Sequence, residues 1–379
     1  MNSRNGLNFS GGPGALPENV LQQMREATVA VPEVGLSLFG ISHRSDWFAG
    51  IVRELEDNVR SLLGLPKNYH VLLLQGGATQ QFSMVPMTLL RGKKNPAEYL
   101  QTGYWSGKVV PEAAREGPVR VLWSGEKDKF SRLPTDDELP FSPDAPYIHY
   151  VSNETVEGLQ FHRVLGLDGV PRVCDMSSDF LSKPCDADKF SLIYAHAQKN
   201  LGPAGVTVVL VRDELLRDVP DNLPGFLDYR NHVTAHSNFN TPPVFAIYVV
   251  LLVTRWLMQE IGGLANMDQV NRRKAALLYG LLDASDGFYR GIAAERDRSL
   301  MNVSFRLATP ELDQRFIAEA QAAGFSGLSG HRALGGIRAS IYNAVSMCAV
   351  EKLAGFMEDF RRGKATVTLA PVKQLRWGT

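Results

Sequence analysis

One lysine stands where an apolar run gives way to turn residues, in the segment AQKNLGPAG at residues 197–205. The apolar runs on either side, residues 190–195 and 206–211, are typical of buried strands. Burial lowers the pKa of an amine, and an unprotonated lysine adds to carbonyl groups. Lys199 is therefore a candidate for covalent catalysis, although a hairpin lysine with a solvated head group fits the same pattern taken alone.

A carboxylate precedes this lysine at the end of another strand. Asp175 follows Val173 and Cys174 at the end of the expected short strand 172–174, and Ser177 and Ser178 come soon after it. Adjacent strands of an open α/β sheet deliver their C-terminal residues to one crevice, where ligands bind. An ordinary ion pair fits this spacing. So does pyridoxal phosphate, which needs a lysine for its aldehyde and an acid that keeps its ring nitrogen protonated.

The loop Gly76-Gly77-Ala78-Thr79 lies between a predicted strand and a predicted helix. Small residues there expose backbone N–H groups at a helix N-terminus, which is a ready phosphate site. The lysine of a nucleotide-binding P-loop is missing. A plain turn between strand and helix fits this loop equally well.

Arginines with neighbouring histidines offer sites for further anions, because the guanidinium fork matches carboxylate and phosphate in a bidentate way. Exposed surface charge is the alternative for each pair. The eight histidines show no spacing typical of a metal site, so no metal is expected. The anion-binding candidates are His43, Arg44, His331, Arg332 and Arg338.

Composition excludes several classes of function. The 379 residues are 44% hydrophobic, and 40 basic residues balance 40 acidic ones, so no net field attracts nucleic acid or a membrane surface. The apolar run 244–253 is too short to span a bilayer. Three cysteines without a disulfide or zinc pattern, and a polar start to the chain, predict a reduced cytoplasmic protein.

Strands that alternate with helices or long loops predict a large, mostly parallel α/β domain over residues 16–264. A smaller α+β domain is expected over residues 265–379, with residues 1–15 joining the two and a loosely held tail at 364–379. Asp46 is the expected N-cap of a helix that Gly64 ends. The other expected helices are 17–27, 242–261, 266–284, 310–323 and 350–361, and the expected strands are 70–74, 98–101, 119–123, 147–151, 172–174, 190–195, 206–211, 302–307 and 338–343.

Together these pieces resemble the phosphoserine aminotransferase family, class-V enzymes of the fold-type I group that depend on pyridoxal phosphate. The resemblance covers residues 7–362. Many bacterial members carry an arginine where this chain has Thr79. The motifs that carry the resemblance are NFSGGP (8–13), SHR (42–44), GYW (103–105), NET (153–155), AQKNLGPAG (197–205), FNTPP (239–243) and GHR (330–332).

The resemblance implies a reversible transamination of O-phosphoserine with 2-oxoglutarate, used in serine biosynthesis, with a side activity on 4-phosphohydroxythreonine in vitamin B6 biosynthesis. It implies a homodimer with shared sites. By position, Lys199 and Asp175 are catalytic, and Arg338 binds the substrate α-carboxylate. The phosphate or γ-carboxylate at the far end of the substrate is bound by His43 and Arg44, with His331 and Arg332 from the partner chain. The residues implied to hold the cofactor are Ala78, Thr79, Trp105, Thr155, Asp175, Gln198 and Lys199, with Asn240 and Thr241 from the second subunit.

Other functions compete with this interpretation. A serine–glyoxylate aminotransferase would share the fold, but its small substrate would not need two His-Arg pairs. A catalytically silent, anion-binding dimer on the same scaffold is disfavoured by the intact Lys199 and Asp175. A nucleotide-binding α/β protein is disfavoured by the missing P-loop lysine.

Overall fold

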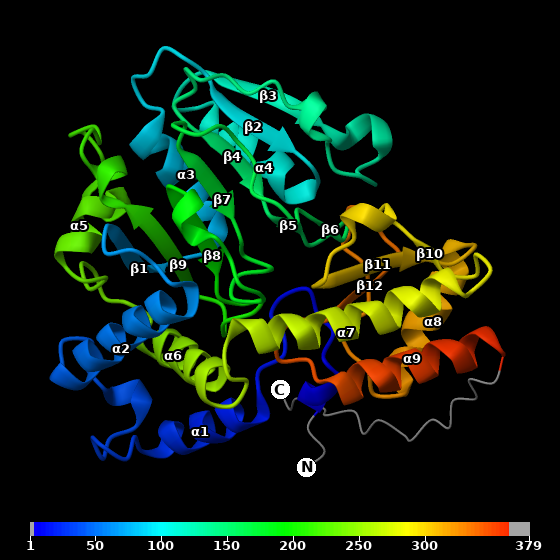
Figure 1. Ribbon diagram of the computed structural model, residues 1–379. Helices are drawn as coiled ribbons and strands as arrows, with labels where there is room; N and C mark the ends of the chain where they lie inside the picture. Colours follow the sequence, from blue (N-terminus) through cyan, green and yellow to red (C-terminus); the bar gives the residue numbers. More distant parts are fainter. Residues whose placement is uncertain (1–3, 364–379) are drawn as a thin grey trace, which may run out of the picture.

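The computed structural model describes residues 4–363, and a seven-stranded sheet forms its centre (Figure 1). Its strands are β1 (Tyr69–Gln75), β2 (Ala97–Gln101), β3 (Val119–Ser124), β4 (Ile148–Val151), β7 (Arg172–Asp175), β8 (Leu192–His196) and β9 (Val206–Arg212). They follow the order β1-β9-β8-β7-β4-β2-β3. The strands from β3 to β8 pair in parallel, and β9 is antiparallel to both β8 and β1. The predicted mostly parallel sheet is confirmed.

Both faces of this sheet are buried, because successive side chains of a strand point to opposite faces. In β1, Val71 and Leu73 join the core under one layer of helices, while Leu72 and Leu74 join the core under the other. The first layer contains α1 (Glu18–Val29), α2 (Asp46–Leu63) and α6 (Val244–Gln259), and the second contains α3 (Ala78–Leu89), α4 (Tyr104–Ala113) and α5 (Tyr229–Thr234).

One helix start differs from the expectation. The N-cap of α2 is Ser45, whose Oγ accepts a hydrogen bond from the backbone N–H of Phe48 at 3.2 Å, and Asp46 is the first helical residue. Asp46 still stabilises the helix, because a carboxylate in the first turn faces the positive end of the helix dipole. Gly64 ends the helix in the left-handed conformation, as predicted.

The C-terminal part contains a second, antiparallel sheet in the order β10-β11-β12, formed by Arg290–Gly291, Asn302–Arg306 and Ile337–Ser340. Helices α7 (Leu264–Asp283), α8 (Pro310–Ala322) and α9 (Met347–Arg361) pack with it (Figure 1). Met267 of α7 belongs to the core of the large sheet and Ala275 to the core of the small one. The domain boundary at residue 265 stays a prediction, and the expected tail at 364–379 lies outside the described residues.

Helix α6 is the most apolar helix, and most of its side chains are buried. Within residues 4–363, no single helix is long and apolar enough to cross a membrane. Helices α6 and α7 pass that test only as a pair, by length and composition, and the chain bends by 90° between them.

A buried lysine joins α7 to the loop after β12. The Lys274 side chain is fully buried, and its Nζ donates hydrogen bonds to the carbonyl oxygens of Ile341, Tyr342 and Val345 at 2.9, 2.8 and 3.0 Å. An ammonium has three N–H donors, so each one is satisfied. The backbone N–H of Asn343, in the same loop, donates to Asn200 Oδ1, which ties this loop to the residue after Lys199.

Replacing this lysine tests the connection. We expect Lys274→Met to lower the free energy of unfolding by about 2–4 kcal/mol, because three buried carbonyls lose their donor. Urea unfolding followed by circular dichroism measures the change. The exposed Lys352 on α9 provides the control, and Lys352→Met should change stability by less than about 0.5 kcal/mol. Equal effects of the two substitutions would contradict the role of Lys274.

Candidate active site

Lys199 lies in the turn of an antiparallel hairpin, three residues after β8 ends. Its Nζ donates a hydrogen bond to Thr155 Oγ1 at 2.6 Å and lies 5.7 Å from the centroid of the Trp105 ring. Burial lowers the pKa of Lys199 to about 8, against the opposing pull of the Asp175 carboxylate. The hairpin is therefore real, but the head group lies inside the protein rather than in solvent.

Asp175 is the last residue of β7, next to β8 in the sheet. Its side chain is 5% exposed, and Oδ1 accepts a hydrogen bond from the backbone N–H of Ser177 at 2.8 Å. Burial raises the pKa of Asp175, while the Lys199 charge and hydrogen bonds from Ser177 oppose that rise. Neighbouring parallel strands thus bring the acid and the lysine to the same edge of the sheet, as the sequence predicts.

A cavity of about 240 Å³ opens between these two groups. Seven of the predicted cofactor residues line it: Ala78, Thr79, Trp105, Thr155, Asp175, Gln198 and Lys199. The remaining lining residues are Gly77, Val151, Asn153, Ser177, Ser178 and His196. The sequence-based selection therefore identified one coherent site from segments that are far apart in the chain.

One end of the cavity is suited to an anion. Helix α3 begins there at Ala78, and its N-cap Gly77 provides no side-chain hydrogen bond to the first turn. Free backbone N–H groups and the positive end of the helix dipole attract a phosphate. Gly76 has a φ of +114°, which a residue with a side chain rarely adopts, so the glycine shapes this loop.

Arg338 on β12 lies beside the lysine end of the cavity. Its Nη1 donates a long hydrogen bond of 3.5 Å to the carbonyl of Thr155, and it has no ion-pair partner within residues 4–363. The guanidinium packs directly on Gly11, where a Cβ would collide with it, and Tyr342 Oη donates to the Gly11 carbonyl at 2.9 Å. The NFSGGP motif therefore packs against the Arg338 guanidinium through Gly11. This arginine has no ion pair within the described residues and can bind an anion.

The other predicted residues are not all brought to this cavity. His43, Arg44, Asn240 and Thr241 do not line it. The segment around His43 and the segment that leads to Asn240 lie side by side, because Asn238 Nδ2 donates to the His43 carbonyl at 2.9 Å.

Asn240 lies near the phosphate loop, where its Nδ2 donates to Gln75 Oε1 at 2.7 Å. Whether Asn240 and Thr241 serve the second subunit's cofactor stays a prediction.

The His331 ring contacts a residue next to the cavity. Its ring centroid lies 4.5 Å from that of Tyr104, the residue before Trp105 in the same chain. Arg332 follows it as an exposed residue. Neither His331 nor Arg332 lines the cavity, and whether they serve the partner's site stays a prediction.

Sequence reasoning missed several residues of the site. Ser177 bonds Asp175, and the His196 ring contacts Thr207 Oγ1 through Nδ1 at 3.0 Å. Two buried glutamates, Glu154 and Glu157, lie under the start of α4. Their only signal in the sequence is the short spacing around Thr155 in NETVE, because solvent exposure is not visible in a sequence.

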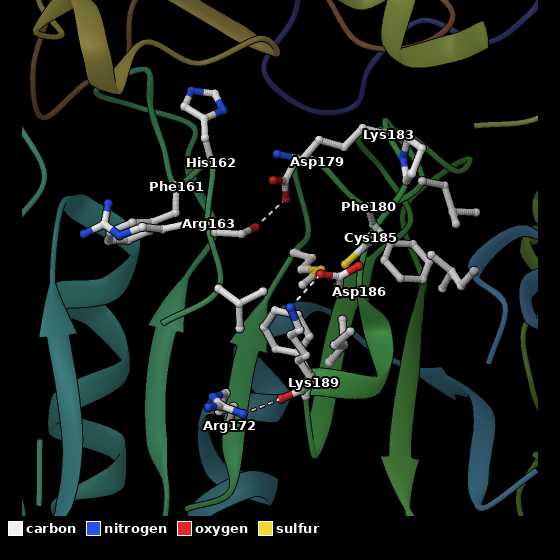
Figure 2. A pocket seen from close by; sticks show the side chains of 18 of the residues that line it. Phe161, His162, Arg163, Arg172, Asp179, Phe180, Lys183, Cys185, Asp186 and Lys189 are labelled. Atoms are coloured by element: carbon white, nitrogen blue, oxygen red, sulfur yellow. Dashed lines mark hydrogen bonds and ion pairs between the residues drawn. The ribbon is translucent and has the colours of Figure 1, made fainter. Parts of the chain in front are cut away.

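A larger cavity of about 800 Å³ lies elsewhere, over β4, β7 and β8 (Figure 2). Several of its charged side chains already have partners: Lys189 bonds Asp186 at 2.8 Å, Arg172 bonds Asp168 at 2.7 Å, and Asp179 accepts from Ser152 and Gln160. None of the predicted site residues lines it. Size alone therefore does not identify the active site in this chain.

The smaller cavity fits pyridoxal phosphate. It provides an amine for the aldehyde, a carboxylate at the end of the neighbouring strand for the ring nitrogen, an indole face and an anion-binding helix start.

Comparison with known proteins agrees with this geometry. The family model for class-V aminotransferases matches residues 7–353. A phosphoserine aminotransferase of Rhodopirellula baltica is 46% identical over 355 residues, which cover 93% of this chain and 94% of that protein. The chain belongs to the phosphoserine aminotransferase family. This membership confirms the predicted fold type and the prediction of an aminotransferase.

Solved structures lead to the same family. Phosphoserine aminotransferase from Bacillus circulans subsp. alkalophilus superposes with a TM-score of 0.91 at 44% identity, covering 94% of this chain and 98% of that one. A pyridoxal phosphate-bound phosphoserine aminotransferase from Trichomonas vaginalis superposes with a TM-score of 0.87 at 34% identity, covering 93% and 99%.

The lowered pKa of Lys199 predicts how the apoprotein takes up its cofactor. Only the neutral amine attacks an aldehyde, so the rate of covalent uptake should rise with pH through about 8 and then level off. Stopped-flow absorbance after mixing apoprotein with pyridoxal phosphate measures this rate. Lys199→Ala should show no covalent uptake. A rate that still rises steeply above pH 9.5 would indicate a solvated lysine instead.

Proposed function

We propose that this chain catalyses the reversible transamination between O-phosphoserine with 2-oxoglutarate and 3-phosphohydroxypyruvate with glutamate, as a step of serine biosynthesis. The observation that carries the proposal is the Lys199 amine held between Trp105 and Thr155, one strand from Asp175. Identity of 44–48% to several phosphoserine aminotransferases over more than nine-tenths of the chain supports the substrate assignment.

The cofactor is pyridoxal phosphate, which when bound supplies an aldehyde that exchanges with amines and a ring that accepts electrons. Asp175 would keep the ring nitrogen protonated, and Thr155 would bond the ring hydroxyl. Trp105 would pack on the ring. Gln198, with the backbone of Ala78 and Thr79 at the start of α3, would hold the phosphate.

Lys199 moves the proton of the reaction. It is the only lysine among the residues that line the cavity, and its Nζ takes the proton from the substrate Cα. Its lowered pKa suits this role, because a general base works best when its pKa lies near the working pH.

Cations hold the substrate at both ends. Arg338 binds the α-carboxylate, since its guanidinium forms no ion pair within the described residues and makes only a long hydrogen bond to the Thr155 carbonyl. His331 and Arg332 lie on the side of Tyr104, and with His43 and Arg44 they bind the distal phosphate or γ-carboxylate. The same arrangement accommodates 4-phosphohydroxythreonine, whose phosphate lies one carbon further from Cα.

The enzyme is a homodimer in which each site is completed by the partner. Support comes from the surface around His43 and Asn240, neither of which lines the cavity of its own chain. Phe39 is 71% exposed and stacks on Phe245 at 5.3 Å, and Phe239 is 44% exposed. Large exposed aromatic side chains near one another indicate an interaction surface. We propose that His43 and Arg44 are the pair that the partner supplies, and the contact of His331 with Tyr104 of its own chain supports this choice.

We also propose a cytoplasmic location. Cys174, Cys185 and Cys348 are free thiols, which is typical of a reducing compartment.

Substrate preference tests the assignment. Activity with O-phosphoserine and 2-oxoglutarate should exceed activity with serine by at least about a hundredfold in kcat/KM, because the distal cations stay unpaired with serine. A coupled assay for glutamate measures it, with 4-phosphohydroxythreonine as a third substrate. Comparable rates with serine and glyoxylate would contradict the proposal.

Mixed dimers test which residues cross the interface. Neither Lys199→Ala nor Arg44→Ala homodimers should be active. Random mixing of the two chains should restore about a quarter of wild-type activity, because half of the dimers are mixed and each contains one intact site. The matched control mixes Lys199→Ala with Arg338→Ala, whose positions serve the same chain's site, and should restore nothing. Restoration in both mixtures, or in neither, would contradict the shared site.

A further inference from the structure

Two glutamates converge beneath the first turn of α4. Glu154 is 1% exposed and Glu157 is 3% exposed. A Cβ added at Gly103 would collide with Glu157 Oε2 and with Glu154 Cδ, so both carboxyl groups reach the same point. Glycine is therefore required here, and the two acids lie close enough to repel one another when both are ionised.

Hydrogen bonds around the pair suit one negative charge rather than two. Glu154 accepts from the backbone N–H groups of Trp105 and Ser106 at 3.2 and 3.1 Å, and from Thr102 Oγ1 at 3.2 Å. Glu157 Oε1 accepts from the N–H of Tyr104 at 2.9 Å, whereas its buried Oε2 has no partner within residues 4–363. A proton on Oε2 removes this unpaired charge. Burial first, and then the charge of Glu154, raises the pKa of Glu157 to about 8.

The charged and titratable groups around the pair come from several elements. Arg338 on β12 reaches the segment that carries both glutamates, because its Nη1 donates to the carbonyl of Thr155 at 3.5 Å. Arg338 and Glu157 act on one another electrostatically. The charge of Glu154 opposes the lowering of the Lys199 pKa. Tyr104 on α4 contacts His331, and burial and nearby arginines lower the pKa of that histidine below its usual value.

We propose that Glu154 and Glu157 share one proton and that this proton keeps Arg338 open to the carboxylate of the substrate. With Glu157 neutral, the single charge on Glu154 is balanced by the helix start, and Arg338 keeps its full attraction for an incoming anion. When Glu157 ionises, the pair competes for Arg338 and repels the carboxylate. Glu157 is thus a positioning residue of the substrate site, and this inference rests on the role of Arg338 in the proposed function.

Glutarate binding tests the inference without turnover. Glutarate has two carboxylates and no amine, so its own charge stays constant from pH 6.5 to 9.5. Calorimetry on the pyridoxal phosphate-loaded enzyme should show Kd rising about tenfold between pH 7 and 9.5 in the wild type. In Glu157→Gln, an uncharged isostere, Kd should stay near the wild-type value at pH 7 across the range, with kcat for phosphoserine changed by less than KM.

A third buried glutamate gives the control. Glu98 is fully buried but pairs with Arg120 at the far edge of the sheet, and Glu98→Gln should keep the wild-type pH profile. If Glu157→Gln does not fold, the wild-type profile alone still decides. A constant wild-type Kd, an equal slope in Glu157→Gln, or no glutarate binding at pH 7 overturns the inference. Inactivity towards phosphoserine would instead refute the proposed function, and that assay is separate.

Discussion

The burial of one amine, that of Lys199, is the constraint on which the rest of this site depends. Taking an ammonium out of water costs several kcal/mol unless nearby groups compensate. Thr155 accepts a hydrogen bond from it, and Asp175 faces it from the neighbouring strand. Both depend on strand order, because β4 delivers the chain to Thr155, β7 ends at Asp175 and β8 leads to Lys199. A different order would leave the amine buried without its partners.

The antiparallel strand β9 brings the phosphate site to the lysine. Because β9 returns directly from the Lys199 turn and pairs with β1, the ends of two loops meet, and the N–H of Gly76 donates to the Gly205 carbonyl at 3.1 Å. Thr207 Oγ1 donates to the Gly76 carbonyl at 3.0 Å. That hydroxyl then accepts from the His196 ring, which must carry its proton on Nδ1. The loop at Gly76, which is suited to the phosphate, and the Lys199 turn are thus held at a fixed separation.

Local signals explain how much of this was predictable. Asp175, Lys199 and Gly76-Gly77 each follow an apolar run, so their common edge follows from the rules of parallel sheets. Arg338 and His331 carry no such signal, because the small sheet that positions them is formed by contacts distant in sequence. Ser45 displaced Asp46 as the cap of α2, since both are good caps and only the backbone geometry selects one. The glutamates under α4 could not be predicted, because their burial depends on Gly103 packing against them.

The two ends of the cavity obey different physical requirements. The cofactor end holds a resident group, so its partners can be fixed on strand ends and a helix start. The substrate end must bind and release an anion at each turnover, so its arginine cannot have a permanent ion pair. Arg338 meets this requirement, since the only hydrogen bond of its guanidinium among the described residues is a long one to a carbonyl. An isolated cation that is half-buried is costly. A nearby acid that carries a shared proton lowers that cost without occupying the guanidinium, which explains why carboxyl groups lie so close to a site that binds carboxylates.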